Sequence, residues 1–144
     1  MSIYPEINLP TIAIPRSQRD TKYHGAPNFD FTTGDFVTDG HGRMLLDDGK
    51  TAFEKWCLKT CMVERRTRLA YSDKVGIEFE TLSKKSSPEA VKSALIRTLT
   101  EAILCHPAAE YVKNFRFASE GDNLRVTFDV KGRDLPASTI SIVY

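Results

Sequence analysis

The residues best suited to chemistry form a dense polar cluster, Glu64-Arg65-Arg66-Thr67-Arg68, which is followed by Glu78. Glu64 and Glu78 could act as the paired carboxylates of a glycosidase. Arginines lie beside Glu64 in the sequence, however, and neighbouring cations favour the ionised carboxylate, which is the opposite of what a general acid requires. We therefore expect no catalytic residues. Recognition of a partner is one interpretation, because arginine pairs bidentately with carboxylates. A solvated turn or an internal ion pair fits the residues equally well.

The side chains that bind metals or carry redox chemistry are scattered. The chain has three cysteines and three histidines. Cys57 and Cys61 share one face of a predicted helix, but a metal site there would need two more ligands. We expect these thiols to be reduced and packed in the core. Asp39-Gly40-His41-Gly42 is too short for a phosphate loop. The sequence predicts no metal, no cofactor and no small-molecule substrate.

Length and charge limit the class of protein. A chain of 144 residues is the size of one domain and can bury a core without disulfides or metal. Its 20 basic and 19 acidic residues nearly cancel, which argues against nucleic acid as a partner. The N-terminus lacks the pattern of a signal peptide, and no apolar run has the length of a membrane span. We expect a protein that stays in the cytoplasm unless it leaves as part of a larger particle.

Residues 1–28 differ from the rest of the chain. Pro5, Pro10 and Pro15 recur at a spacing of five among isoleucines and leucines. Proline breaks helices and keeps the preceding residue extended, so this segment is predicted to be an extended N-terminal arm. Its apolar content fits two interpretations equally: a tail over the domain's own core, or an arm laid onto a partner chain. Residues 29–144 are then a single domain.

The first half of this domain predicts a strand-turn unit and a helix. Phe29 to Phe36 alternates around Gly34, and Asp39 to Gly42 gives a second turn. An amphipathic helix is predicted over residues 51–63, after the helix-favouring acids at 47 and 48. Its buried stripe is Ala52, Phe53, Trp56, Cys57, Thr60 and Cys61.

The second half predicts a long helix and a sheet. Residues 75–82 have mixed spacing, and a short helix is the favoured interpretation. Ser87-Pro88-Glu89 is a typical helix start, and this helix runs to Cys105. Alternation predicts strands over residues 111–118, 124–131 and 139–144. The fold class is α+β: two main helices packed on a small, mostly antiparallel C-terminal sheet.

The order of these features over residues 29–144 resembles the PBSX-type prophage baseplate proteins, relatives of the small, lysozyme-like baseplate wedge protein of contractile-tailed phages. The matching segments are Phe29 to Phe36, residues 49–53, Val63-Glu64-Arg65, residues 70–72, Gly76-Ile77-Glu78-Phe79, the long helix ending at His106-Pro107 and the terminal strands. No single motif is specific; their order and spacing together carry the resemblance.

The resemblance implies two partner-binding surfaces. The wider family has a Glu-Pro-Arg loop that grips the other wedge proteins, and Glu64, Arg65 and Arg66 occupy its places. The PBSX-type subset has a Glu-Arg pair, so which arginine makes the contact is open, and Arg68 belongs to the same cluster. The family's terminal sheet receives strands of the tail sheath protein. The residues expected to do so here are Thr139, Ile140, Ser141, Ile142, Val143 and Tyr144.

The function expected from this resemblance is structural. The chain would be a wedge subunit of a contractile phage tail or tail-like particle, in six copies per baseplate, joining the inner baseplate ring to the sheath. It would be assembled in the bacterial cytoplasm and reside in the virion. The alternatives are a small cytosolic adaptor, since a bacterial anti-adaptor family resembles this fold, and a cell-wall hydrolase. A proline at Ser141 or Val143 is expected to remove backbone donors from opposite edges of the last strand.

Overall fold

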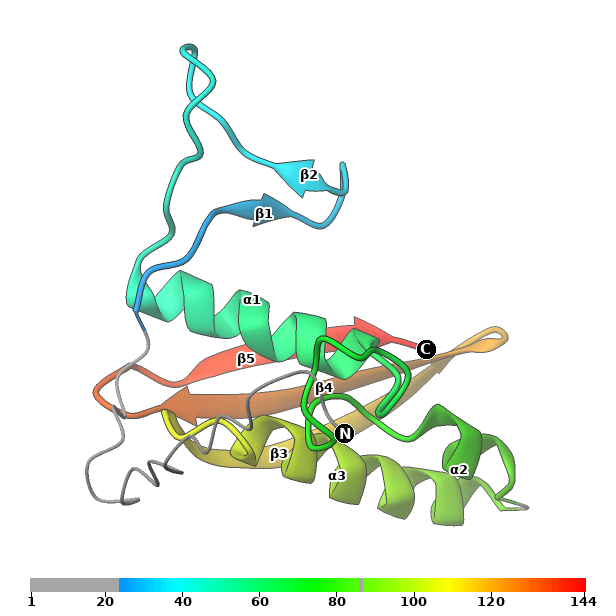
Figure 1. The fold of residues 1–144 in the computed structure, drawn as a ribbon. Coiled ribbons are helices and arrows are strands. Elements are labelled where there is room, and N and C mark those ends of the chain that lie inside the picture. Colours follow the sequence, from blue (N-terminus) through cyan, green and yellow to red (C-terminus); the bar gives the residue numbers. More distant parts are fainter. Residues whose placement is uncertain (1–23, 86) are drawn as a thin grey trace, which may run out of the picture.

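The structure, a computed structural model, describes residues 24–85 and 87–144. Most of the predicted N-terminal arm therefore lies outside the described residues, and the division into an arm and a domain stays a prediction. The described part has an α+β architecture, which confirms the predicted fold class. Two long helices cover one face of a three-stranded antiparallel sheet, and a separate two-stranded hairpin lies beyond the first helix (Figure 1).

The sheet contains β3 (Ala109–Glu120), β4 (Asn123–Gly132) and β5 (Ser138–Val143), in the order β3-β4-β5. The alternation of apolar and polar residues in β4 predicted this strand correctly, because every second side chain faces the helices. Val126, Phe128 and Val130 are buried, whereas the residues between them lie on the polar face. β4 is the central strand, so β3 and β5 are the two edges.

The helices begin and end close to the predicted positions. α1 (Gly49–Met62) starts after Asp48, whose carboxylate accepts the Thr51 backbone N–H at 2.7 Å. α3 (Pro88–Leu104) is capped in the same way by Ser87. The predicted helix over residues 75–82 was wrong in extent: α2 is only Phe79–Ser83. Residues 75–78 are instead extended and lie beside the segment that follows α1, to which they are joined by a parallel β-bridge between Glu64 and Ile77.

The core lies between the two long helices and the sheet. The predicted stripe of α1 is confirmed, with Phe53, Cys57 and Cys61 buried and Trp56 half-buried. The other core side chains come from α3 and the sheet: Leu95, Leu99, Ala102, Ile103, Val126, Phe128, Val130, Ile140 and Ile142. Burial raises the pKa of the Cys61 thiol to about 12 and that of Cys57 further still, so neither thiol ionises near neutral pH.

Residues 24–48 form a small β structure on the side of α1 that faces away from the sheet (Figure 1). The predicted strand-turn unit is confirmed as the hairpin of β1 (Phe29–Asp30) and β2 (Asp35–Phe36). The second predicted turn is also present, with Gly42 at a φ of 79°. Asn28 joins the pieces, because its N–H donates to Leu45 and its carbonyl accepts from Val37.

Candidate functional site

The Glu64–Arg68 cluster does not face outward as one unit, because Arg65 turns into the domain. Its Nη1 lies 3.2 Å from Glu78 Oε1 and 3.4 Å from Glu101 Oε2, and its Nε donates to the Gly76 carbonyl at 3.1 Å. The Arg65 side chain is only 9% exposed. Arg97 on α3 contacts the same two carboxylates, at 3.6 Å and 3.2 Å. Arg65 therefore belongs to an internal ion-pair network, the arrangement that the sequence left open beside docking.

Glu64 is held by the backbone and not by its arginine neighbours. Its Oε2 accepts the Phe79 N–H at the start of α2. The arginines beside Glu64 in the sequence were expected to act on its carboxylate, but the nearest of them, Arg65, pairs with Glu78 instead. Residues adjacent in an extended segment point in opposite directions, which separates these two side chains.

Gly76 allows the backbone at residues 76–77 to approach the backbone at residues 63–65 closely. Its φ is 98°, a left-handed conformation that suits glycine. A β-carbon at this position would lie 2.6 Å from the Val63 carbonyl oxygen and 3.0 Å from the Arg65 nitrogen. Two backbone hydrogen bonds complete the contact, from Arg65 N to the Ile77 carbonyl and from Ile77 N to the Val63 carbonyl. The backbone on both sides of Arg65 is thus fixed.

The loop that follows Arg65 presents the remaining basic side chains to solvent. Arg66 and Arg68 are exposed, and Leu69, the next residue of the loop, is fully exposed. Arg66 has a φ of 65°, which is uncommon for a residue with a side chain. The turn is closed by a hydrogen bond from the Thr67 hydroxyl to the Glu64 carbonyl, at 2.8 Å. An exposed leucine that directly follows the exposed Arg66 and Arg68 is suited to contact another protein.

The second candidate surface is the outer edge of β5. Leu124 and Tyr144 exchange two backbone hydrogen bonds, at 2.9 Å and 3.0 Å. Hydrogen-bonded pairs alternate along an antiparallel ladder, so Ile142 and Ile140 also bond to β4, through Val126 and Phe128. Thr139, Ser141 and Val143 must then point their N–H and C=O groups away from β4. Among the described residues, no strand pairs with that side of β5.

This geometry corrects one expectation about β5. The Ser141 and Val143 amides were expected to lie on opposite edges of the strand, and this was wrong because backbone direction repeats every two residues. Both amides face the outer edge. Their side chains are exposed, whereas Ile140 and Ile142 are buried on the face of β5 that packs against α1. Tyr144 then turns inward, and its hydroxyl donates to the Cys61 carbonyl at 3.0 Å.

Other kinds of site were sought in residues 24–85 and 87–144. No group of three or more histidine, cysteine or acidic side chains in this part of the chain is arranged to hold a metal ion. None of the helices described there is long and apolar enough to cross a membrane.

The chain was compared with known proteins once these features were established. Residues 26–134 match the family model of the contractile injection system sheath initiators, which covers the hairpin, the three helices and two strands of the sheet. No curated protein matches the chain. The match confirms the resemblance to baseplate proteins of contractile tails at the level of the family. This chain belongs to the family of contractile injection system sheath initiators.

Proposed function

We propose that the chain is a non-enzymatic wedge subunit that joins the inner baseplate ring to the sheath of a contractile tail or tail-like particle. The outer edge of β5 is the observation that carries this proposal. Three successive outward positions, Thr139, Ser141 and Val143, offer backbone donors and acceptors to an added strand. None of the three carries a charge that would repel another strand. The occupant is an extended segment of the sheath protein.

Strand addition suits an initiator for a physical reason. Main-chain hydrogen bonds give affinity that depends weakly on sequence, and the pockets for alternate side chains give register. β5 is rigid because Ile140 and Ile142 are fixed in the core. A rigid edge does not have to be ordered when a strand binds, so less affinity is lost than on a loop. β5 lies just beyond the residues matched by the family model, so its role rests on its geometry.

The wedge contact is assigned to the exposed half of the arginine cluster. Arg66, Arg68 and Leu69 are available to other wedge proteins, whereas Arg65 is engaged with Glu78 and Glu101. Arg65 and Glu64 hold the loop in position, and Arg66 takes the place of the family's contact arginine. In the complete particle we expect six copies per baseplate, assembled in the cytoplasm, without nucleic acid, membrane or small-molecule partners.

The sheath contact is tested by proline substitution at the outer edge. Ser141→Pro and Val143→Pro each remove one outward amide donor without removing a bond to β4. We expect baseplates to form with either variant. Sheath polymerisation on these baseplates should fall at least about tenfold, because an added strand would lose one hydrogen bond and clash with the proline ring. Negative-stain electron microscopy counts sheathed and bare baseplates.

Ser141→Ala and Val143→Ala are the matched controls, because each changes the side chain and keeps the amide. These controls should polymerise sheath like the parent chain. If both proline variants fold, enter baseplates and still initiate sheath normally, β5 is not the platform and the proposal fails.

The absence of catalysis is a separate part of the proposal. Both oxygens of Glu78 face guanidinium groups, and Glu64 is bonded to the α2 backbone, so neither carboxylate is placed as a free acid. Purified protein should leave peptidoglycan intact in a zymogram. Clearing that disappears with Glu64→Gln would overturn this part and favour a cell-wall hydrolase.

A further inference from the structure

The helix α1 lies along β5, the edge strand of the sheet (Figure 1). Two hydrogen bonds join them: the Ser138 hydroxyl donates to the Glu54 carboxylate at the start of β5, and the Tyr144 hydroxyl donates to the Cys61 carbonyl at its end. A helix with its side chains is about 10 Å wide, whereas neighbouring strands lie about 4.8 Å apart. One flank of α1 therefore reaches beyond β5, over the place that an added strand would take.

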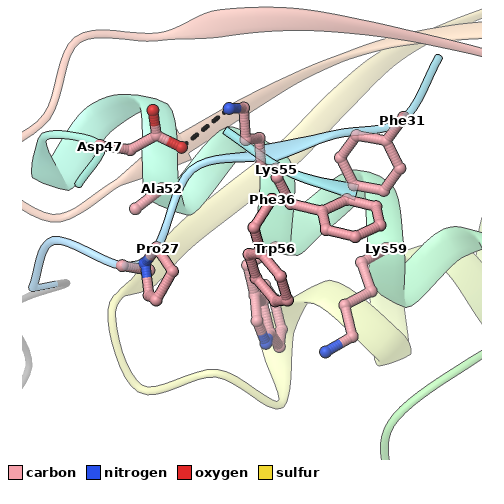
Figure 2. A pocket seen from close by; sticks show the side chains of 10 residues that line it. Pro27, Phe31, Phe36, Asp47, Ala52, Lys55, Trp56 and Lys59 are labelled. Carbon is pink, nitrogen blue, oxygen red and sulfur yellow. Dashed lines mark ion pairs between the residues drawn. The ribbon is translucent and has the colours of Figure 1, made fainter. Parts of the chain in front are cut away.

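The flank of α1 on the β5 side contains Glu54, Leu58 and Met62. These residues recur at a spacing of four, so they form one stripe along the helix, and Glu54 is the member that contacts β5. Trp56 lies two residues from both Glu54 and Leu58, which places it on the opposite side of the helix. On that side Trp56 and Lys59 line the space under the β1–β2 hairpin (Figure 2).

The two apolar members of this stripe, Leu58 and Met62, are the α1 strip. Leu58 is half-buried and packs partly against the core, whereas Met62 is 58% exposed. Single exposed apolar side chains are common on protein surfaces and mean little by themselves. The α1 strip differs because it continues the unpaired edge of β5, and no strand of the described residues lies on that side of β5.

An added strand would turn every second side chain toward the α1 strip. Side chains that face each other across two paired strands lie on the same side of the sheet. Positions paired with Thr139, Ser141 and Val143 would therefore place their side chains on the polar face. Positions paired with Ile140 and Ile142 would place theirs on the helix face, between these isoleucines and the α1 strip. Apolar side chains are favoured there, because the site would exclude water.

We propose that the segment received by β5 is an amphipathic strand, whose alternate apolar side chains pack against Leu58 and Met62 of α1. The inference rests on the proposed function for the strand addition itself, and it adds the side-chain pattern that the partner segment must have. Backbone hydrogen bonds distinguish poorly between extended segments. The α1 strip would supply the missing selection, because a slip of one residue would turn the apolar side chains of the added strand to the polar face.

The first test changes the polarity of the strip without changing its size. Met62→Gln places an amide of similar length where an apolar contact is expected, and an unpaired buried amide is unfavourable. We expect baseplates to form and the fraction that carries sheath, counted by negative-stain electron microscopy, to fall about tenfold. Met62→Leu keeps the apolar contact and should initiate sheath like the parent chain.

Met44→Gln is the matched control for this substitution. Met44 is exposed to a similar extent, 56%, but belongs to the β structure on the other side of α1. This variant should initiate sheath normally. Urea denaturation of both glutamine variants checks that the fold is unchanged, as expected for exposed positions.

The second test identifies the contacting segment directly. The photo-reactive amino acid p-benzoylphenylalanine takes the place of Met62, and sheathed particles are irradiated. We expect a cross-link to the sheath protein, which mass spectrometry places in a segment with apolar residues at every second position. The same amino acid in place of Met44 should give no cross-link to that segment. If Met62→Gln is unstable, the cross-link alone decides.

The outcomes separate this inference from the function on which it rests. Normal initiation by Met62→Gln, together with defective Ser141→Pro and Val143→Pro, overturns the role of the strip and leaves β5 as the platform. Normal initiation by both proline variants overturns the platform and the inference together. A Met62→Gln chain that folds but stays out of baseplates assigns the strip to baseplate assembly. A cross-link to residues 1–23, to a wedge subunit or to a sheath segment without alternation also overturns the inference.

Discussion

The two edges of the sheet are built in opposite ways, although both flank the same central strand. β3 is long and irregular: its register shifts between Lys113 and Arg116, and Asn114 between them has a φ of 58°. Both of these charged side chains are exposed. β5 is short and regular along its whole register with β4, and its outward side chains are Thr139, Ser141 and Val143. One edge has the features that prevent strand addition, and the other does not.

This difference supports the proposal that β5, and not β3, receives a partner strand. Proteins block exposed edges with bulges and charged residues, because an unpaired strand is a template for aggregation. β3 has both devices, whereas β5 has neither. Asn114 and Arg116 are further tied to Asp129 of β4, at 2.8 Å and 3.4 Å, so the bulge is held in place by side chains. A regular, uncharged edge opposite one so protected is what the proposed addition of a sheath strand to β5 requires.

The largest effect that tests this comparison is expected within β5 itself. Ile142→Pro removes an amide that bonds to β4 and a core side chain that is only 6% exposed. We expect a loss of at least about 3 kcal/mol in the free energy of unfolding. Val143→Pro, one residue away, should lose less than about 1 kcal/mol, because its amide faces outward. Urea denaturation followed by Trp56 fluorescence measures both.

Equal stability losses in the two variants would mean that the hydrogen-bond alternation along β5 has been assigned incorrectly. The outer edge would then contain Ile140 and Ile142 amides, and the choice of positions for the sheath test would have to be reversed. The comparison of the two edges would lose its basis in β5.

The next effect separates inward from outward residues in the arginine cluster. Arg65→Ala removes the buried guanidinium and its bond to the Gly76 carbonyl, and leaves Glu78 and Glu101 with only the more exposed Arg97, so we expect a loss of about 2 kcal/mol in unfolding free energy. Arg66→Ala should change stability by less than about 0.5 kcal/mol and still weaken wedge assembly. Thermal unfolding and co-purification with wedge subunits measure the two properties. A stable Arg65→Ala protein would contradict the internal network.

Sequence reasoning succeeded where the controlling interactions are local. The alternation of β4 and the Ser87-Pro88 start of α3 are set within a few residues, and both were predicted. The direction of Arg65 was not predictable, because its partners Glu78 and Glu101 are 13 and 36 residues away. The extent of α2 was missed for the same reason, since the Glu64–Ile77 bridge takes residues 75–78 out of the helix.

The space between the β1–β2 hairpin and α1 shows the same limit of sequence-based prediction. Phe29, Phe36 and Trp56 were each recognised as members of apolar patterns, with Trp56 read as a core anchor. Nothing local indicates that the hairpin would stand apart from α1 and leave a space between the rings. That separation depends on Lys55 meeting Asp47 and Asn28, and the second of these contacts spans 27 residues.

A smaller effect concerns how the end of β5 is fixed. Tyr144→Phe removes the hydrogen bond to the Cys61 carbonyl and keeps the ring contact with Phe79, so we expect a loss of about 1 kcal/mol. Burial raises the pKa of Tyr144 far above its usual range, so the donor stays protonated and the loss should be the same from pH 6 to about pH 9. Denaturation at several pH values measures it. A loss that vanishes at the alkaline end would show that the phenol ionises there and that solvent reaches it.

The smallest effect on stability gives the most direct test of the two edges. Lys113→Thr with Arg116→Thr removes both charges from β3, and because both sites are exposed the unfolding free energy should change by less than about 0.5 kcal/mol. We expect the variant to self-associate, since uncharged threonines on an edge strand favour pairing with a second copy. Lys84→Thr with Lys85→Thr removes the same charge away from the sheet and should stay like the parent chain. Light scattering over a range of concentrations compares the three proteins. If the β3 variant remains as dispersed as the control, the bulge at Asn114 closes this edge without help from charge, and the protection of β3 lies in its backbone alone.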